Sequence, residues 1–169
     1  IGRASEKGYD QQGRFVHADC YASASAQVQR AHSIGVELLA GTDNIDTYVF
    51  SGSSLHDELA MLVDAGLTPL EALQTATINP AKFAELDHEF GSVEVGKQGD
   101  LLLLNANPLS DIRHTADIFG VLFAGQYFDQ KALETLDQYA VDMAQSPQVN
   151  VRFLYDILAS PLMRTQLAD

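Results

Sequence analysis

The stretch "LLAGTDN", residues 38–44, ends a run of apolar residues on an acid. Residues 36–40 ("VELLA") predict a short buried strand, and Gly41 and Thr42 indicate a turn after it. Asp43 is therefore expected directly after the carboxyl end of a strand, where proteins with buried parallel strands often place catalytic groups. An aspartate here could equally stabilise the turn by accepting a hydrogen bond from its own backbone. The residues alone leave both interpretations open.

Helix signals stand on both sides of this turn. Residues 1–20 show no sustained period and predict mostly loop, whereas the alanine-rich residues 21–33 predict a helix that Gly35 ends. After the turn, Ser54 with Asp57 three positions later indicates a capping pair at the start of a second helix.

The clearest start signal is the group Thr68, Pro69 and Glu71. These residues predict an N-cap, a first-turn proline and a capping-box acid. A further short helix is predicted to begin near Asn79 and to run through Leu86. Three consecutive helices are therefore expected after one strand.

The pattern changes near residue 90, where strand character begins. Two strand pairs are predicted, at residues 93–95 with 101–104 and at residues 118–123 with 126–128. The run 101–104 is entirely leucine, which predicts a strand buried on both faces. Helical periodicity returns from residue 130, breaks at Ser146 and Pro147, and resumes at Ser160 and Pro161.

Composition narrows the class of protein. The chain has 169 residues, a hydrophobic fraction of 46% and a charged fraction of 20%, as expected for a globular protein. The net charge of −13 argues against a nucleic-acid or anionic-membrane partner, and no apolar run is long enough to span a bilayer. Cys20 is the single cysteine, which excludes an internal disulfide and favours a cytoplasmic location. Because the sequence begins at Ile1, we expect that the gene product starts upstream.

Three motifs occur in a specific order. They are "GVELLAGTDN", "SGSSLHDELAMLVDAGLTPLEALQTATINPAKFAEL" and "GSVEVGKQGDLLLLNANPLSDI". Together they resemble the closing third of the amidohydrolase superfamily, in its imidazolonepropionase-like and prolidase-like branch of metal-dependent hydrolases. The resemblance covers about residues 22–128. Gln98 and Gly99 depart from the alanine that the family commonly has before its aspartate, while Asp100 fits.

The resemblance implies an α/β fold. It predicts the C-terminal part of a (β/α)8 TIM barrel, strands of the associated β-sandwich and a helical C-terminal tail. The corresponding boundaries are residues 1–89 for the barrel part, 90–129 for the sandwich strands and 130–169 for the helical extension. A complete barrel needs about 200 residues or more, so this chain is expected to be a C-terminal portion of a longer protein.

The resemblance also assigns a role to Asp43. In the family, this aspartate is a ligand of a divalent metal, usually zinc, in a site that holds one or two ions. It takes a proton from the metal-bound water and passes it to the leaving nitrogen, so the substrate would be a small-molecule amide, peptide or cyclic amide. The motifs that supply the other ligands are absent from this sequence. The chain is therefore expected to be inactive alone and to need its missing N-terminal part or another subunit.

Two further residues are candidates for substrate contacts. His56 lies in the first turn of the helix after the Asp43 loop, in a position where this branch often has histidine. Asn44 follows the expected ligand directly and could orient it or reach a substrate, although each residue also fits an ordinary turn or helix start. A metal-binding role for His17 beside Asp19 is disfavoured, because the pair does not lie in the family's strand motif.

A function of another class also fits the sequence. The chain could be a non-catalytic fragment or interaction module whose unpaired strand edges are covered by another chain. The helices from residue 130 onward would then be the docking element.

Overall fold

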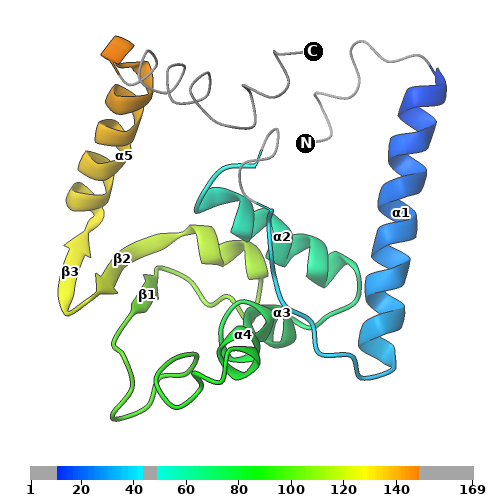
Figure 1. The fold of residues 1–169 in the computed structure, drawn as a ribbon, viewed down its shortest axis with the longest axis horizontal. Coiled ribbons are helices and arrows are strands. Elements are labelled where there is room, and N and C mark those ends of the chain that lie inside the picture. The colour runs from blue at the N-terminus through cyan, green and yellow to red at the C-terminus, as the bar shows by residue number, and fades with distance from the viewer. Residues whose placement is uncertain (1–10, 44–48, 149–169) are drawn as a thin grey trace, which may run out of the picture.

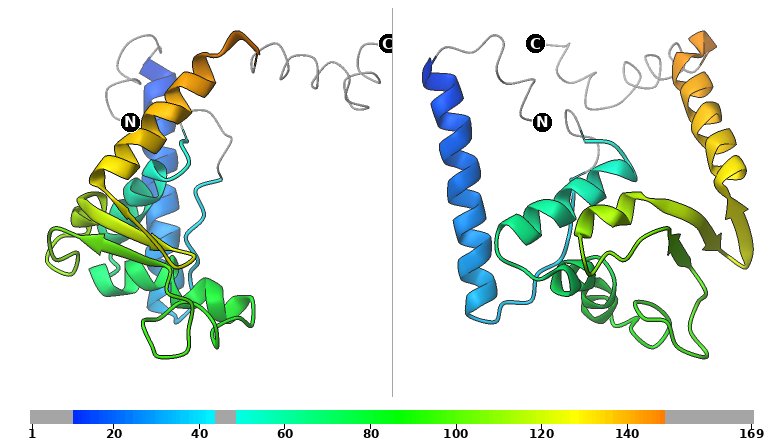
Figure 2. Two further views of the ribbon diagram at one scale, coloured as in Figure 1. Left: turned by 90° about the vertical axis from the view of Figure 1, so that its left-hand side faces the viewer. Right: turned by 180° about the vertical axis from the view of Figure 1, so that it is seen from behind.

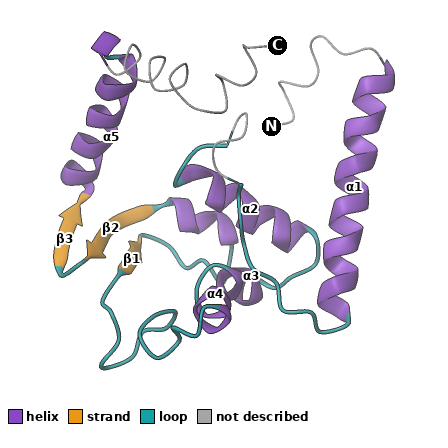
Figure 3. Cartoon of the chain, in the orientation of Figure 1, coloured by secondary structure: helices purple, strands orange, loops and turns teal. Residues whose placement is uncertain are grey.

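The computed structural model describes residues 11–43 and 49–148, and every structural statement below concerns these residues. The first half is helical, with α1 (Gln11–Ser33), α2 (Ser53–Asp64), α3 (Pro69–Thr75) and α4 (Ile78–Phe83). The second half contains β1 (Leu101–Leu104), the 3-10 helix η1 (Ile112–Ala116), β2 (Ile118–Phe123), β3 (Gln126–Asp129) and α5 (Gln130–Gln145). Helices and a small sheet are thus combined, as Figures 1 and 3 show, and the predicted α/β class is confirmed.

Helices α1 and α5 lie on opposite sides of the group formed by α2, α3 and α4 (Figures 1 and 2). The sheet lies on the α5 side and is antiparallel, with the order β1-β2-β3. Leu102 pairs with Val121, and Val121 pairs with Phe128. A closed barrel and a sandwich are not formed by the described residues, so both remain expectations.

The core lies where α2, α3 and η1 meet. Leu59, Ala72 and Ile112 come from these three elements and have exposed fractions of 4%, 0% and 2%. Half-buried apolar residues pack around them, namely Ala60, Leu62, Val63, Leu73 and Ala76. This cluster joins the helical half of the chain to the half that contains the sheet, because η1 directly precedes β2.

The N-terminal helix is longer than predicted. It begins at Gln11, so the prediction of a loop is wrong for residues 11–20, and residues 1–10 lie outside the described part. Its end is as predicted: Gly35 has a φ of 80°, and its N–H donates to the carbonyl of His32 at 3.0 Å. Glycine adopts this left-handed conformation at little cost, which accounts for its position after the helix.

The predicted strand at residues 36–40 is not formed. The segment has no ladder partner among the described residues and hydrogen-bonds to helices instead. A buried strand needs a neighbouring strand on at least one side, and the described residues offer none here. Residues 36–40 are therefore an extended segment that follows α1 and belongs to no sheet among the described residues.

The helix after the Asp43 loop begins differently from the prediction. Gly52 is its N-cap, with a φ of 87° and no side-chain capping bond, so the capping pair of Ser54 and Asp57 is wrong. The hydroxyl of Ser54 instead accepts a hydrogen bond from the N–H of Phe50 at 2.8 Å. The position of the helix itself is confirmed by α2.

The capping box of α3 is confirmed in full. The hydroxyl of Thr68 accepts from the N–H of Glu71 at 3.3 Å, and the carboxylate of Glu71 accepts from the N–H of Thr68 at 2.8 Å. Pro69 is the first helical residue. The next helix, α4, ends at Phe83 and is therefore shorter than the predicted helix through Leu86.

The strand predictions are confirmed in part. Strands form at β1, β2 and β3, but not at residues 93–95, where the chain turns between Gly91 and Gly96 at positive φ. A Cβ atom at Gly91 would lie 2.9 Å from the Cβ of Ala81, so only glycine fits against α4 there. The leucines of β1 are half-buried or exposed, which contradicts burial on both faces.

The C-terminal helix begins and breaks as predicted. Helix α5 ends at Gln145, and Ser146 is its C-cap. The segment expected to start at Ser160 and Pro161 lies outside the described residues. No helix within 11–43 and 49–148 is long and apolar enough to cross a membrane.

Thr68→Ala should reduce the free energy of unfolding by about 1 kcal/mol, because it removes the hydroxyl that caps α3. Thr68→Ser keeps a hydroxyl and is the matched control. Chemical denaturation of both variants checks this expectation, and equal stabilities would show that the cap contributes nothing.

The pKa of Glu71 gives a dependence of stability on pH. Hydrogen bonds from the Thr68 hydroxyl and, to a lesser degree, the Thr68 amide lower this pKa; burial opposes them, and His32 at 3.5 Å lowers it further. The folded pKa lies below the unfolded value, so this stabilisation is complete above the ordinary glutamate pKa of about 4.3. It is lost as the pH falls through the lowered folded value.

We therefore expect wild type to melt at a higher temperature than Glu71→Gln at pH 7, and the difference to shrink toward pH 3. Thermal unfolding across this pH range measures it. Glu134→Gln, which changes an exposed glutamate in α5, is the control for general charge effects. A constant difference between wild type and Glu71→Gln would contradict the expectation.

Candidate active site

Asp43 lies at the end of the extended segment that follows α1. It is exposed and has a φ of 50°, in the left-handed region that aspartate tolerates better than most residues. Its carboxylate has no hydrogen-bond partner within the described residues. The alternative in which Asp43 stabilises a turn involves the backbone that follows it, and residues 44–48 lie outside the described part of the chain.

Three hydrogen bonds fix the segment that leads to Asp43. The carbonyl of Leu38 accepts from Nδ2 of Asn79 at 3.0 Å, and the N–H of Ala40 donates to the carbonyl of Thr75 at 2.9 Å. The N–H of Gly41 donates to Oε1 of Glu58 at 2.7 Å. The partners belong to α4, α3 and α2, so three helices together replace the missing strand neighbours.

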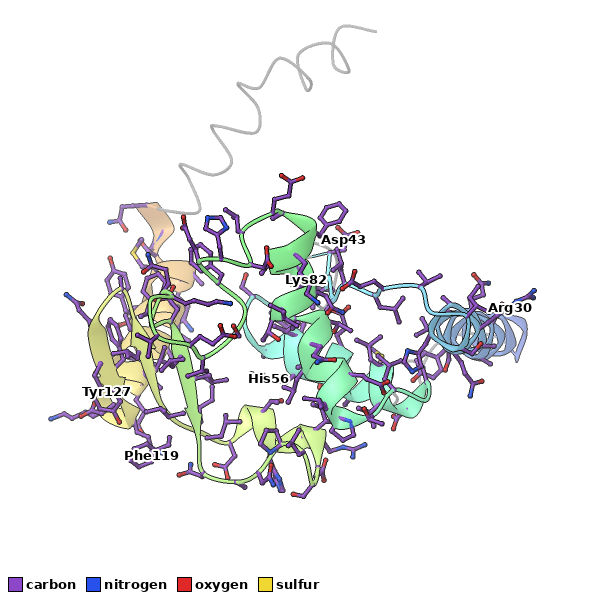
Figure 4. The ribbon with its side chains drawn as sticks, turned by 90° about the horizontal axis from the view of Figure 1, so that it is seen from below. Arg30, Asp43, His56, Lys82, Phe119 and Tyr127 are labelled. Carbon is purple, nitrogen blue, oxygen red and sulfur yellow. The ribbon has the colours of Figure 1, made fainter. Side chains whose placement is uncertain are left out.

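His56 lies in the first turn of α2 and faces η1. Its Nδ1 is 3.0 Å from the hydroxyl oxygen of Thr115, which is 3% exposed. Figure 4 shows His56 among the helices and Asp43 beside the extended segment. No hydrogen bond joins the two candidates within the described chain.

The partner of His56 determines its neutral tautomer. The hydroxyl of Thr115 donates its single proton to the carbonyl of Ile112 at 2.8 Å. We therefore expect its oxygen to accept from His56, which favours the neutral tautomer with the proton on Nδ1. In this tautomer Nε2 keeps its lone pair and can accept a hydrogen bond.

The other candidates of the sequence are not brought to Asp43. Asn44 lies outside the described residues, and His17 lies in the part of α1 whose side chains are not described. His32 contacts Glu71 at 3.5 Å, and Nδ1 of His114 is 2.9 Å from the carbonyl oxygen of Asn107. These two histidines therefore have structural partners of their own.

Asp43 fits a metal site as a single ligand. The carboxylate of Asp43 is exposed and has no hydrogen-bond partner within residues 11–43 and 49–148, and carboxylate oxygen is a normal ligand of zinc. Residues 11–43 and 49–148 contain no group of three or more His, Cys, Asp or Glu side chains that could hold a metal ion. Further ligands would have to come from residues outside these ranges.

Glu58 and Thr115 were not singled out in the sequence, although Glu58 bonds to the segment that leads to Asp43 and Thr115 bonds to His56. Glu58 had a readable signal, because it is an acid three positions after Leu55 and four before Leu62, within the apolar stripe of α2. Thr115 had none, since nothing in its local sequence indicates contact with a histidine 59 positions away.

Comparison with known proteins identifies the family to which this chain belongs. The sequence model of the amidohydrolase family matches residues 19–127, which is more than half of the chain. This chain belongs to the amidohydrolase family. The predicted recognition is thereby confirmed, and the matched residues include the extended segment, the core helices and the sheet.

Curated relatives of this amidohydrolase chain include deaminases and an imidazolonepropionase. It is 30% identical over 136 residues to the 5-methylthioadenosine/S-adenosylhomocysteine deaminase of Thermoanaerobacter pseudethanolicus, covering 69% of the chain and 32% of the relative. It is 52% identical over 40 residues to the imidazolonepropionase of a Geobacillus species, covering 24% and 9%. The chain thus spans at most about a third of these relatives.

Solved structures show the same relationship. A Xaa-Pro dipeptidase with bound methionine in its active site superposes with a TM-score of 0.56 at 28% identity, covering 62% of this chain and 25% of that one. A molinate hydrolase superposes with a TM-score of 0.56 at 27% identity, covering 63% and 26%. The described fold is therefore similar to part of larger hydrolases.

Thr115→Val should change the neutral tautomer of His56, because valine keeps the shape of threonine but cannot accept a hydrogen bond from the Nδ1–H group. We expect a loss of about 1–3 kcal/mol in unfolding free energy, because Nδ1 of His56 and the carbonyl of Ile112 both lose their hydrogen-bond partner. Nitrogen-15 NMR of the histidine ring at alkaline pH identifies the tautomer. Thr115→Ser should retain the Nδ1–H form, and an unchanged tautomer in Thr115→Val would contradict the assignment.

Proposed function

We propose that this chain is part of a metal-dependent hydrolase that cleaves C–N bonds, with Asp43 as metal ligand and proton shuttle. Membership of the amidohydrolase family supports the reaction class. The observation that carries the proposal is the position of Asp43. Its exposed carboxylate has no hydrogen-bond partner among the described residues and ends a segment held by three helices.

A divalent metal, proposed to be zinc as one or two ions, would supply a Lewis acid and lower the pKa of water toward neutrality. Asp43 would receive the proton that the attacking water loses and deliver it to the leaving nitrogen. A carboxylate suits both steps, because it is a base at neutral pH and a proton donor once protonated. The remaining ligands are proposed to lie in a missing N-terminal part or another subunit.

The proposed substrate is a small molecule with an amide, peptide or cyclic amide bond. Relatives named as deaminases and imidazolonepropionase, and a structure named as a Xaa-Pro dipeptidase, support this class. Asn44 and His56 are proposed to contact it, with Nε2 of His56 as the available acceptor. We also propose the boundaries 1–89, 90–129 and 130–169 for the barrel part, the sandwich strands and the helical extension.

A non-catalytic interaction module is the second candidate, and strand β1 favours it. β1 is an edge of the sheet, and its Leu102 and Leu103 are 45% and 40% exposed. An apolar edge strand can pair with a strand of another chain. The described structure thus presents a surface on which such a module could assemble.

Asp43→Asn in the full-length gene product should lower kcat at least about a hundredfold on dipeptide and cyclic-amide substrates, because asparagine cannot accept the proton. Metal content, measured by plasma mass spectrometry, should also fall. Asp87→Asn changes another exposed loop aspartate and is the matched control. Unchanged activity and metal content in the Asp43 variant would contradict the proposal and support a structural role for Asp43 in the turn.

The solution mass of this chain tests the interaction module. The interaction module predicts a mass above 18.4 kDa, because β1 would pair with a second copy or partner. Light scattering after size-exclusion chromatography measures it. Leu102→Lys should restore the monomer if the edge is responsible, and a wild-type monomer would argue against obligatory pairing.

A further inference from the structure

Glu58 is an acid within the apolar stripe of a core helix, next to the buried Leu59. One carboxylate oxygen, Oε1, accepts the N–H of Gly41 at 2.7 Å. The other, Oε2, is buried and has no hydrogen-bond partner among the residues that the structure describes. A buried polar atom without a partner destabilises a protein, so packing alone does not explain an acid at this place.

The bond from Glu58 is made two residues before Asp43. It joins a charged acceptor to a backbone N–H, which is the stronger class of hydrogen bond. The other two bonds to the segment are made at Leu38 and Ala40, so Glu58 provides the attachment nearest to Asp43 in the described chain. Thr42 and Asp43 follow directly after this attachment.

The backbone of Asp43 needs such an attachment. Its φ of 50° lies in a region that costs a non-glycine residue free energy, and strained conformations persist only when the surroundings hold them. Glu58 restrains the entry to this turn from α2, which the core packing holds against η1. The restraint therefore connects the buried core to the conformation of the aspartate.

We infer that Glu58 is a positioning residue, which directs the carboxylate of Asp43 by holding the N–H of Gly41. This inference rests on the proposed function of Asp43. Glu58 acts as a hydrogen-bond acceptor and does not itself contact substrate or metal. A misdirected carboxylate would lie away from the reacting atoms, which affects the rate more than substrate binding.

Two variants separate the acceptor from the bulk and the charge of Glu58. Glu58→Gln keeps an acceptor oxygen at the same distance along the side chain but removes the charge. Glu58→Met has similar length and volume and no carboxylate or amide oxygen. Circular dichroism and thermal unfolding establish that both variants remain folded at the assay temperature.

The first measurement does not depend on activity. In protein labelled with ¹⁵N-glycine, the amide of Gly41 should be protected from hydrogen exchange in wild type and Glu58→Gln and exchange at least about tenfold faster in Glu58→Met. Equal exchange in all three proteins would overturn the attachment, whatever the protein catalyses.

The second measurement is steady-state kinetics of the full-length gene product. Glu58→Met should lower kcat by about 10- to 100-fold with little change in KM, while Glu58→Gln should stay close to wild type. An active wild type with unchanged kcat in Glu58→Met would overturn the positioning role alone. A wild type without hydrolase activity would overturn the proposed function and with it any role of Glu58 in that reaction, and the exchange of Gly41 would still decide the attachment.

Discussion

The packing of α2 against η1 and α3 is the constraint on which the described structure depends. Leu59, Ala72 and Ile112 supply one buried residue from each element. Because the side chain of Ala72 is a single methyl group, α3 can approach the other two elements closely. Helix α2 is thereby fixed, and its polar side chains reach outward in two directions, Glu58 to the Asp43 segment and His56 to Thr115.

Much of the helical structure could be predicted because its signals are local. The capping box of Thr68 and Glu71 depends on groups three residues apart, and the structure confirms each part of it. The hairpin turn at Gly125 is local in the same sense. The start of α2 shows the limit, since Gly52 took the N-cap position and Ser54 bonded backward to Phe50.

The predictions that were wrong concern features that depend on partners far away in the chain. A strand at residues 36–40 requires a neighbouring strand, and burial of β1 on both faces requires elements that cover both faces. The described residues supply neither. The same applies to the site. The place of Asp43 at the end of its segment followed from the sequence and from family resemblance. The contacts of Glu58 and Thr115 emerged only when residues far apart in the chain were brought together.

The contact between α2 and η1 also has a consequence for the order of folding. Helices α2, α3 and α4 are joined by short connections, so they can assemble at a low entropic cost of loop closure. His56 and Thr115 are 59 positions apart, and this contact must wait until the long intervening chain has closed. We expect the helical half to form early and the sheet to be secured late, which leaves β1 open to non-native pairing during synthesis.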